Sequence, residues 1–416
     1  MSKAARRLVL GLIAVLGVLA CAGGAPAPAS PTPSTAASSE QTVTATLAAV
    51  GDVLPHHAIK EAARARSGQS NDTDMGFDAL FSDVADQLKK YDLALFNMEG
   101  PITERAYTPA APLVFWAPPG LAGALHRAGF SVAILANNHA LDQGKQGLVE
   151  TLAHLRQARL AVIGAGANFA EASRGLIIEK KGIRFGVVAF TTLLNAYSRQ
   201  MRRQTGEPQV LFWHGWGDAG AEVLAAIKAM RARTDVDVVV VSAHWDAEDA
   251  TRPSTYTRAI AQRVIDAGAD VIIGHHPHVL QPVEYHTAAD GRRALVIYSL
   301  GNFVSNMCPG FYPSSTCEER LGAIAELTFS RRGRERVRLA RVAFLPTWTE
   351  HEPRCPGETR AAYRCIRPIL LERRIQITQQ RLATADRTGA REMNAVLRGD
   401  EMRRELIRQR LQLNDQ

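Results

Sequence analysis

Short apolar segments alternate with longer amphipathic stretches along the chain from Val43 to about Phe344. The amphipathic stretches, such as GLVETLAHLRQA and YTRAIAQRVIDAGA, have the apolar spacing of surface helices, and turn-forming residues bound the apolar segments. Buried strands flanked by helices produce this pattern, which predicts a layered α/β fold. The predicted strands have the sequences TVTATLAAV, LALFNM, SVAILA, LAVIGA, RFGVVAF, VDVVVVSAH, ADVIIGHH and ALVIYSL.

Polar residues follow most of these apolar segments at their C-terminal ends. In open α/β sheets, ligand sites gather at the carboxyl ends of the strands, so we expect five strand ends to converge on one site. The residues at these ends are Asp52, Asn97, Glu99, the run Asn-Asn-His at 137–139, His244 and the run His-His-Pro-His at 275–278.

These residue types together favour a metal site. Carboxylate, amide oxygen and imidazole suit divalent Mn, Fe or Zn, and two such ions can hold a phosphoryl oxygen and activate water. Each element alone also has a structural explanation, because Gly-Asp after a strand is often a turn and an Asn pair before a helix is often a cap. Five such elements in order favour metal binding.

Several longer strings carry a resemblance to a known family. They are GDVL, FNMEGPIT, ANNHALDQGKQGLVETL, VSAHW, GADVIIGHHPHVLQPVEY and IYSLGNF, between Gly51 and Phe303. In these strings the chain resembles the CapA-type (PGA_cap) capsule-synthesis proteins, which are themselves similar to calcineurin-like metallophosphoesterases. The resemblance implies a two-sheet sandwich flanked by helices, with four layers in the order αββα, over residues 43–346. Residues 347–416 would form a basic, partly helical C-terminal extension.

The resemblance also implies a pair of metal ions and their ligands. One carboxylate would bridge the two ions, and the other ligands would divide between them. Carried over residue by residue, the ligands are Asp52, Glu99 as the bridging carboxylate, Asn138, His244, His276 and His278.

The remaining site residues follow from the same resemblance. His139 would protonate the leaving group or stabilise the transition state, and Asp142 would orient its imidazole. Asn97, Glu248 and Asn302 are candidate contacts to substrate. His275 is expected to support the ligands rather than to bind an ion.

The chain departs from the wider superfamily at two ligand positions. The usual D-x-H motif lacks its histidine, because Leu54 stands two residues after Asp52. His56 and His57 are the nearest possible substitutes, and without one of them an ion position is short of a ligand. Glu99 replaces the usual bridging Asp, a feature shared with CapA-type sequences.

The N-terminus has the features of an export signal. A basic start precedes an apolar run from Leu8 to Leu19, which is too short to span a membrane stably. We therefore expect a signal peptide at 1–20, and the string VLAC resembles a lipobox that would make Cys21 a lipidated N-terminus. An ordinary signal peptide with an incidental Cys21 is the alternative. The Ala/Pro/Ser-rich segment 21–42 would be a flexible tether to the membrane at the cell envelope.

Cysteine and charge add weaker constraints. Four cysteines remain in an exported chain, which makes disulfides plausible. Three pairings are possible, of which Cys308 with Cys317 and Cys355 with Cys365 is the simplest, and a zinc site is the alternative. The net charge is +8, with arginine concentrated from residue 331 onward, which indicates an anionic neighbour or a solvated helical face. Nucleic acid is not an expected partner of an exported chain.

Three functions are compatible with these features. The first is a metal-dependent hydrolase, phosphoesterase-like, that acts in the synthesis of capsule, poly-gamma-glutamate or another envelope polymer. The second is a non-catalytic, lipid-anchored accessory protein that binds an acidic polymer or a synthase partner. The third is a recognition domain that holds one structural ion. Substrate identity cannot be read from a fold resemblance.

Overall fold

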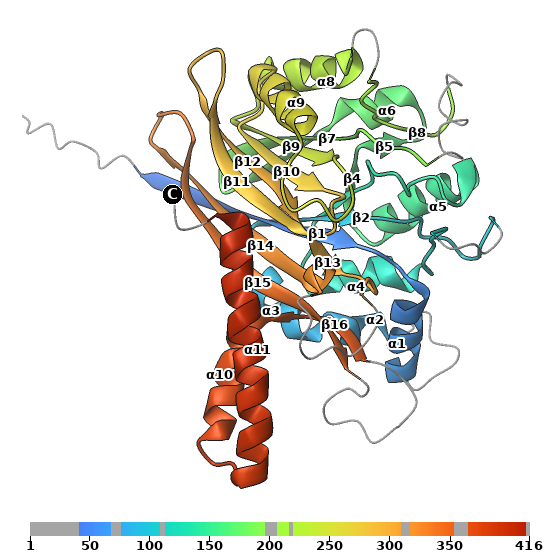
Figure 1. The fold of residues 1–416 in the computed structure, drawn as a ribbon. Helices are drawn as coiled ribbons and strands as arrows, with labels where there is room; N and C mark the ends of the chain where they lie inside the picture. Colours follow the sequence, from blue (N-terminus) through green and yellow to red (C-terminus); the bar gives the residue numbers. More distant parts are fainter. Residues whose placement is uncertain are drawn as a thin grey trace, which may run out of the picture. The chain divides into compact units, whose positions relative to one another are not determined.

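Two β-sheets form the centre of the computed structural model of this chain (Figure 1). The structure describes residues 41–67, 76–108, 113–195, 206–215, 219–308, 317–352 and 365–412. The first sheet has the strand order β16-β15-β14-β1-β2-β3-β4, and β13 also pairs with β1. The second sheet has the order β11-β12-β10-β9-β7-β6, and β5 pairs with β8 in a small third sheet.

The strands of the first sheet are β1 (Thr42–Val53), β2 (Leu93–Met98), β3 (Val132–Ile134), β4 (Ala161–Ile163), β13 (Asn302–Val304), β14 (Leu321–Arg332), β15 (Arg338–Glu352) and β16 (Cys365–Leu370). Those of the second sheet are β6 (Leu176–Lys180), β7 (Ile183–Thr191), β9 (Val238–His244), β10 (Val271–His275), β11 (Leu280–Thr287) and β12 (Arg293–Leu300). The small sheet consists of β5 (Ala165–Gly166) and β8 (Gln209–Val210).

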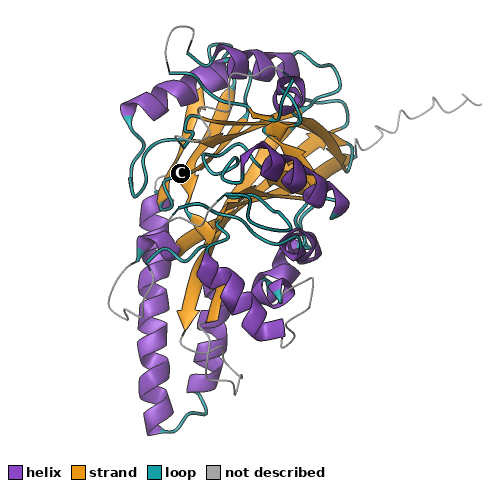
Figure 2. Cartoon of the chain, turned by 90° about the vertical axis from the view of Figure 1, so that its right-hand side faces the viewer, coloured by secondary structure: helices purple, strands orange, loops and turns teal. Residues whose placement is uncertain are grey.

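The helices are α1 (His57–Ser67), α2 (Phe77–Leu80), α3 (Ser82–Leu88), α4 (Gly120–Ala128), α5 (Gly144–Gln157), α6 (Phe169–Arg174), α8 (Ala221–Arg231), α9 (Thr255–Asp266), α10 (Leu371–Leu382) and α11 (Arg387–Leu411), with a short 3-10 helix η1 (Glu318–Arg320). Figure 2 shows them on the outside of the sheets. Within the described residues, no helix is both long enough and apolar enough to cross a membrane.

Alternating side chains of the second sheet bury against different layers. In β9, Val240 belongs to the core that contains Leu95 of the first sheet. Its neighbour Val239 belongs to a second core with Ile227 of α8 and Ile260 of α9. Because successive residues of a strand point to opposite faces, the second sheet lies between the first sheet and a helical layer.

Aromatic side chains join the first sheet to its own helical layer. The ring of Phe96 on β2 lies 4.8 Å from that of Phe130, which lies 5.7 Å from that of Phe303. Phe303 stacks in turn on Phe81, between α2 and α3, with ring centroids 6.4 Å apart. Leu125 of α4 is fully buried in the same core. The predicted αββα sandwich is thus confirmed.

The chain beyond residue 346 contributes to the first sheet. β15 continues to Glu352 and β16 pairs with it, so the boundary expected at 346 falls inside a strand. The helical part expected in the tail is α10 and α11. The buried carboxylate of Asp400 on α11 pairs with Arg374 of α10 and with Arg403, and Arg374 also pairs with Glu350 of β15. Buried ion pairs therefore tie both helices to the sheet.

Part of the cysteine prediction is confirmed. Cys308 and Cys317 form a disulfide, which contradicts a zinc site built on these two thiols. Cys365 is also disulfide-bonded, whereas Cys355 lies outside the described residues. The predicted signal peptide, Cys21 and most of the tether lie outside the described residues as well.

Candidate metal centre

Asp52 stands at the carboxyl end of β1, the central strand of the first sheet, and is fully buried. Its backbone N–H donates to the carbonyl of Gly301, 3.1 Å away. A Cβ atom on Gly51 would lie 1.9 Å from that same oxygen, so β1 requires glycine there to approach the turn after β12. Asp52 Oδ1 accepts a hydrogen bond from Asn97 Nδ2 at 2.8 Å and lies 3.1 Å from His275 Nδ1. Side chains from both sheets thus hold this carboxylate.

Glu99 follows directly on the end of β2 and is also fully buried. Its Oε1 atom lies 3.5 Å from His244 Nε2 and 3.9 Å from His278 Nε2. Within the described residues, Oε1 has no hydrogen-bond partner. A buried carboxylate oxygen in this state is stable only beside a cation or with a proton bound to the group.

The histidines come from the second sheet. His244 ends β9 and His275 ends β10, and the two residues pair in register. His276 and His278 follow β10 with φ angles of 95° and 59°, a region that non-glycine residues rarely adopt. The imidazole of His276 lies 4.7 Å from that of His244 and 5.6 Å from that of His278. Positive φ angles at non-glycine residues, as at His276 and His278, are typical of functional sites.

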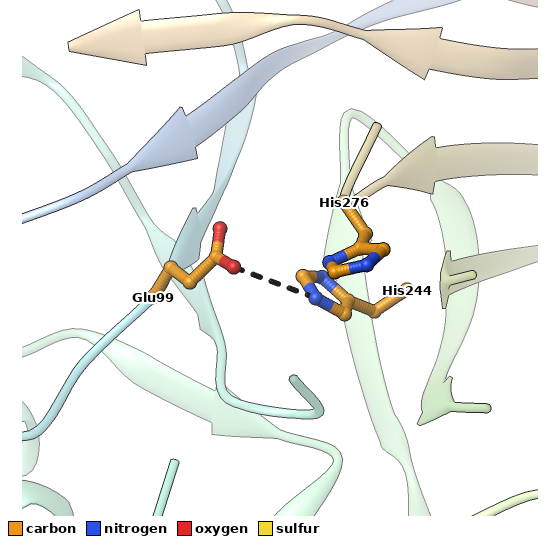
Figure 3. A group of neighbouring side chains, drawn as sticks. All are labelled: Glu99, His244 and His276. Atoms are coloured by element: carbon orange, nitrogen blue, oxygen red, sulfur yellow. Dashed lines mark ion pairs between the residues drawn. The ribbon is translucent and has the colours of Figure 1, made fainter. Parts of the chain in front are cut away.

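Two groups of potential ligands share one carboxylate. Glu99, His244 and His276 form one group, which is drawn in Figure 3. Asp52, Glu99 and His278 form the other, and in each group the donor atoms lie within 4.8 Å of one another. His276 Nδ1, like Glu99 Oε1, has no hydrogen-bond partner in the described part of the chain. Donor atoms that are buried, clustered and unpartnered are suited to bind a metal ion.

The charges in this cluster are unequal. Burial raises the pKa of Asp52, but hydrogen bonds from neighbouring imidazoles outweigh it and hold that pKa well below its usual range. Burial and the charge of Asp52 raise the pKa of Glu99 well above its usual range. Burial lowers the pKa of His244 strongly and that of His276 to about 3. Two imidazoles are therefore neutral at physiological pH, the state that binds metal.

His278 has the opposite charge state. Burial lowers its pKa, but the nearby carboxylates of Glu99 and Asp52 outweigh this and raise the pKa to about 10. Without a metal, His278 is therefore an imidazolium paired with Asp52, whose Oδ2 lies 3.3 Å from His278 Nδ1. A bound ion would take the place of this proton as the counter-charge.

His139 and Asp142 lie in direct contact beside the cluster. Asp142 Oδ2 is 2.7 Å from His139 Nδ1, and both side chains are almost fully buried. The backbone N–H of His139 donates to Asn137 Oδ1 at 3.1 Å. Asn138 Oδ1 lies 2.8 Å from His244 Nε2, which places this loop against the ligand groups. The imidazole of His139 is thus fixed in orientation beside the cluster.

The three predicted substrate contacts have different surroundings. Asn97 donates to Asp52, and Asn302 Oδ1 lies 3.0 Å from His278 Nδ1 while its Nδ2 donates to a backbone carbonyl at 2.8 Å. Both amides therefore position the predicted ligands. Glu248 is exposed and lies close enough to His276 and His278 to form a third potential metal group with them.

Neither His56 nor His57 joins the potential ligand groups found among the described residues. His56 Nδ1 accepts a hydrogen bond from the N–H of Asn306, and its ring packs against Phe115. His57 pairs with Glu61 on α1 and its side chain is 77% exposed. The imidazoles that do lie beside Asp52 are those of His275 and His278, at 3.1 Å and 3.3 Å from its carboxylate.

Sequence reasoning missed two residues at this site. Asn195 Nδ2 lies 3.3 Å from His139 Nδ1, and its Oδ1 accepts a hydrogen bond from Asn138 at 3.2 Å. Asn195 follows the carboxyl end of β7, so the strand-end rule could have found it. Phe115, whose ring lies 4.4 Å from that of His139, is in a loop without such a signal.

The family of the chain follows from comparison with known proteins. The family model described as bacterial capsule synthesis protein PGA_cap matches residues 46–307. The chain therefore belongs to this family. The match contains both sheets up to β13 and all the residues of the metal cluster.

Curated relatives carry related names. The chain is 31% identical to the capsule biosynthesis protein CapA of Bacillus anthracis over 267 residues, which are 62% of this chain and 59% of the relative. It is 31% identical to the PGA biosynthesis protein CapA of Bacillus subtilis (strain 168), over 55% of this chain and 57% of the relative. A probable polyglutamine synthesis accessory protein of Mycobacterium tuberculosis is 29% identical, over 52% and 56%. The chain thus spans somewhat more than half of each relative.

Solved structures show weaker likeness. The NAD nucleotidase of Haemophilus influenzae matches with a TM-score of 0.43 and 13% identity, over 78% of this chain and 54% of the other. A hypothetical protein of Thermus thermophilus matches with a TM-score of 0.40 and 15% identity, over 72% and 98%. The strand order and layers of the chain itself define its fold.

Metal binding should release protons and strengthen with pH. Because the pKa of His278 is raised to about 10, its proton is present throughout the neutral range and an ion must displace it. We expect the affinity for Mn²⁺ to rise about tenfold per pH unit for each proton displaced between pH 6 and 8. Calorimetric titrations in two buffers of different ionisation enthalpy measure this release. Affinity independent of pH, without proton release, would contradict the charge states described above.

Proposed function

We propose that this chain is a metal-dependent hydrolase that cleaves a phosphoester, or another ester or acyl bond, during synthesis of a capsule or envelope polymer. The observation that carries the proposal is the shared carboxylate, because Glu99 belongs to two groups of potential ligands at once. A carboxylate in that position suits two divalent ions, which we take to be Mn, Fe or Zn.

The residues around the cluster supply the remaining chemistry. Ions bound there would act as Lewis acids toward a water molecule and a substrate oxygen. The water would give one proton to solvent, its oxygen would form a bond to the phosphorus or carbonyl carbon, and the bond to the leaving oxygen would break. With His139 Nδ1 engaged by Asp142, His139 Nε2 is the atom that can donate a proton to that leaving oxygen. Burial of Asp142 keeps the imidazole in one orientation.

The polymer context rests on the relatives. Their names concern capsule, PGA and polyglutamine synthesis, and we extend that context to this chain. An acidic envelope polymer or its synthase is the corresponding partner. The net charge of +8 is compatible with an acidic partner, although many of the arginines, such as Arg374 and Arg403, already form internal ion pairs.

Removal of His139 should abolish turnover while the metal remains bound. For His139→Ala we expect hydrolysis of phosphomonoester and phosphodiester probes to fall by about 10²- to 10⁴-fold, because a general acid contributes that much. The metal content should be unchanged, since His139 is in neither group that contains Glu99. Steady-state rates and elemental analysis of the same samples give both quantities. His214→Ala serves as the matched control and should retain full activity, because the His214 side chain is 35% exposed and lies outside the metal groups and the pocket beside them.

A non-catalytic accessory role is the alternative, and the name of the Mycobacterium tuberculosis relative favours it. If protein loaded with Mn, Fe or Zn is shown to contain the metal and still hydrolyses no probe, the hydrolase proposal fails and the accessory role stands. A strain that carries only the His139→Ala/His276→Ala protein separates the two in the cell. Normal polymer yield in that strain supports the accessory role, and lost polymer at unchanged protein abundance supports catalysis.

We also propose that the protein is exported and anchored by lipid at Cys21. The support is the sequence alone, with its basic start, short apolar run and VLAC string. Cys21→Ser should move the protein from the membrane fraction to the soluble fraction and abolish incorporation of labelled fatty acid. An unchanged membrane fraction in this variant would show that Cys21 is not the anchor.

A further inference from the structure

A separate pocket lies beside the candidate metal centre. It has a volume of about 470 Å³ and lies between the start of α1, the loop around residue 115 and the loop after β13. Most of its walls are apolar. One lining residue, Lys60, carries an ammonium group. We call it the Lys60 pocket. Its apolar walls are Pro55, Ala58, Leu113, Val114, Phe115 and Trp116.

Phe115 separates this pocket from the catalytic residues. The centroid of its ring lies 4.4 Å from that of His139 and 4.9 Å from that of His56, which also lines the pocket. Its N–H donates to Asp142 Oδ2 at 2.8 Å, and its carbonyl accepts a hydrogen bond from Gln143 Nε2 at 3.0 Å. The carboxylate that orients His139 therefore also fixes the wall of the pocket. A group bound in the pocket would lie one aromatic ring away from His139.

Lys60 brings a charge into this apolar space. The residue is only 8% exposed, and its Nζ atom donates to the carbonyl of Trp116 at 2.7 Å and lies 4.5 Å from the ring centroid of Trp116. An ammonium group has three N–H donors. Within the described residues, the hydrogen-bond acceptor for Lys60 Nζ is the carbonyl of Trp116. Burial lowers the pKa of Lys60 to about 8. The carboxylate of Glu61, which also lines the pocket, is paired with the exposed His57 at 3.1 Å.

We propose that the Lys60 pocket binds an apolar arm of the substrate that ends in a single carboxylate, next to the bond that is cleaved. The apolar walls would bury the arm, and Lys60 would pair with the carboxylate. One ammonium in apolar surroundings neutralises one negative charge, so a phosphate dianion would leave a buried charge without a partner. This inference rests on the proposed hydrolase function, because it assigns the substrate class of the same site.

Paired probes of equal shape test the charge preference. Calorimetry on the metal-loaded protein compares 4-phenylbutyrate with its neutral amide, 4-phenylbutyramide. We expect the carboxylate to bind at least about tenfold more tightly, as a charge-assisted hydrogen bond predicts. Lys60→Met, which keeps the length of the side chain, should reduce this preference to about twofold or less. The same change at Lys89, an exposed lysine outside the pocket, is the matched control and should leave the preference intact.

A second variant tests the pocket without removing the charge. Ala58→Phe would fill the space between α1 and the Phe115 loop, and it should weaken binding of both probes. An intact melting temperature and metal content in each variant establish that the fold and the cluster remain. Equal binding of the two probes by the wild type, or an unchanged preference in Lys60→Met, overturns the proposal.

The binding test is separate from the test of catalysis. Binding needs no turnover. A Lys60-dependent preference in a protein that hydrolyses nothing would therefore support the pocket proposal and contradict the hydrolase proposal. If hydrolysis occurs, Lys60→Met should raise KM for carboxylate-bearing esters and leave KM for neutral esters unchanged. Hydrolysis with no such difference in KM would support the hydrolase proposal and contradict the pocket proposal.

Discussion

The fully buried carboxylate of Glu99 is the constraint on which the rest of the site depends. It lies where the edges of the two sheets meet, close to Asp52 from one sheet and to His244 from the other. A buried charge without a partner costs on the order of several kcal/mol, so this cluster requires a proton or a cation. The fold accommodates this demand by aligning the carboxyl ends of β1, β2, β9 and β10 at one place. Close approach of β1 to the turn after β12, possible only with Gly51, completes the alignment.

The surroundings of Glu99 divide into the potential metal ligands and the residues to which the proposed function assigns catalysis. His244 and His276 are neutral and positioned as ligands, and His278 carries the proton that balances Asp52 when no metal is bound. His139 lies just outside these groups, with its orientation set by Asp142. Since Asp142 also accepts a hydrogen bond from the N–H of Phe115, one carboxylate contacts both the imidazole of His139 and the wall of the Lys60 pocket. A change at Asp142 would therefore alter the orientation of His139 and the shape of the pocket together.

Much of the fold and of the cluster could be predicted from the sequence, because both rest on local patterns. Apolar segments that end in Asp, Glu, Asn or His mark strand ends, and parallel strands bring those ends together. The roles of Asn97 and Asn302 could not be predicted in this way. The Asn97 amide contacts Asp52 across the neighbouring strands β1 and β2, and the Asn302 amide on β13 contacts His278 in the loop after β10. Both contacts depend on register and on the packing of the two sheets, which a single sequence does not display. The roles assigned to the ligands and to His139 remain predictions from the family resemblance.

Features that depend on long-range packing could not be predicted from the sequence. The continuation of the first sheet past residue 346 required knowledge that β16 pairs with β15, although 12 undescribed residues separate them. The Lys60 pocket is assembled from α1, the Phe115 loop and the loop after β13, which are far apart in the sequence. Its lysine, in an otherwise helical pattern, could not be distinguished from an ordinary surface lysine until its burial was known.

The most direct test of the central claim is the metal content of protein comprising residues 41–416, purified without chelators. It should be compared with that of the His276→Ala/His278→Ala variant, which removes one imidazole from each of the two groups that share Glu99. A carboxylate that bridges two ions implies about two transition-metal ions per chain in the wild type and their loss in the variant. Near-zero metal in both proteins would contradict this claim.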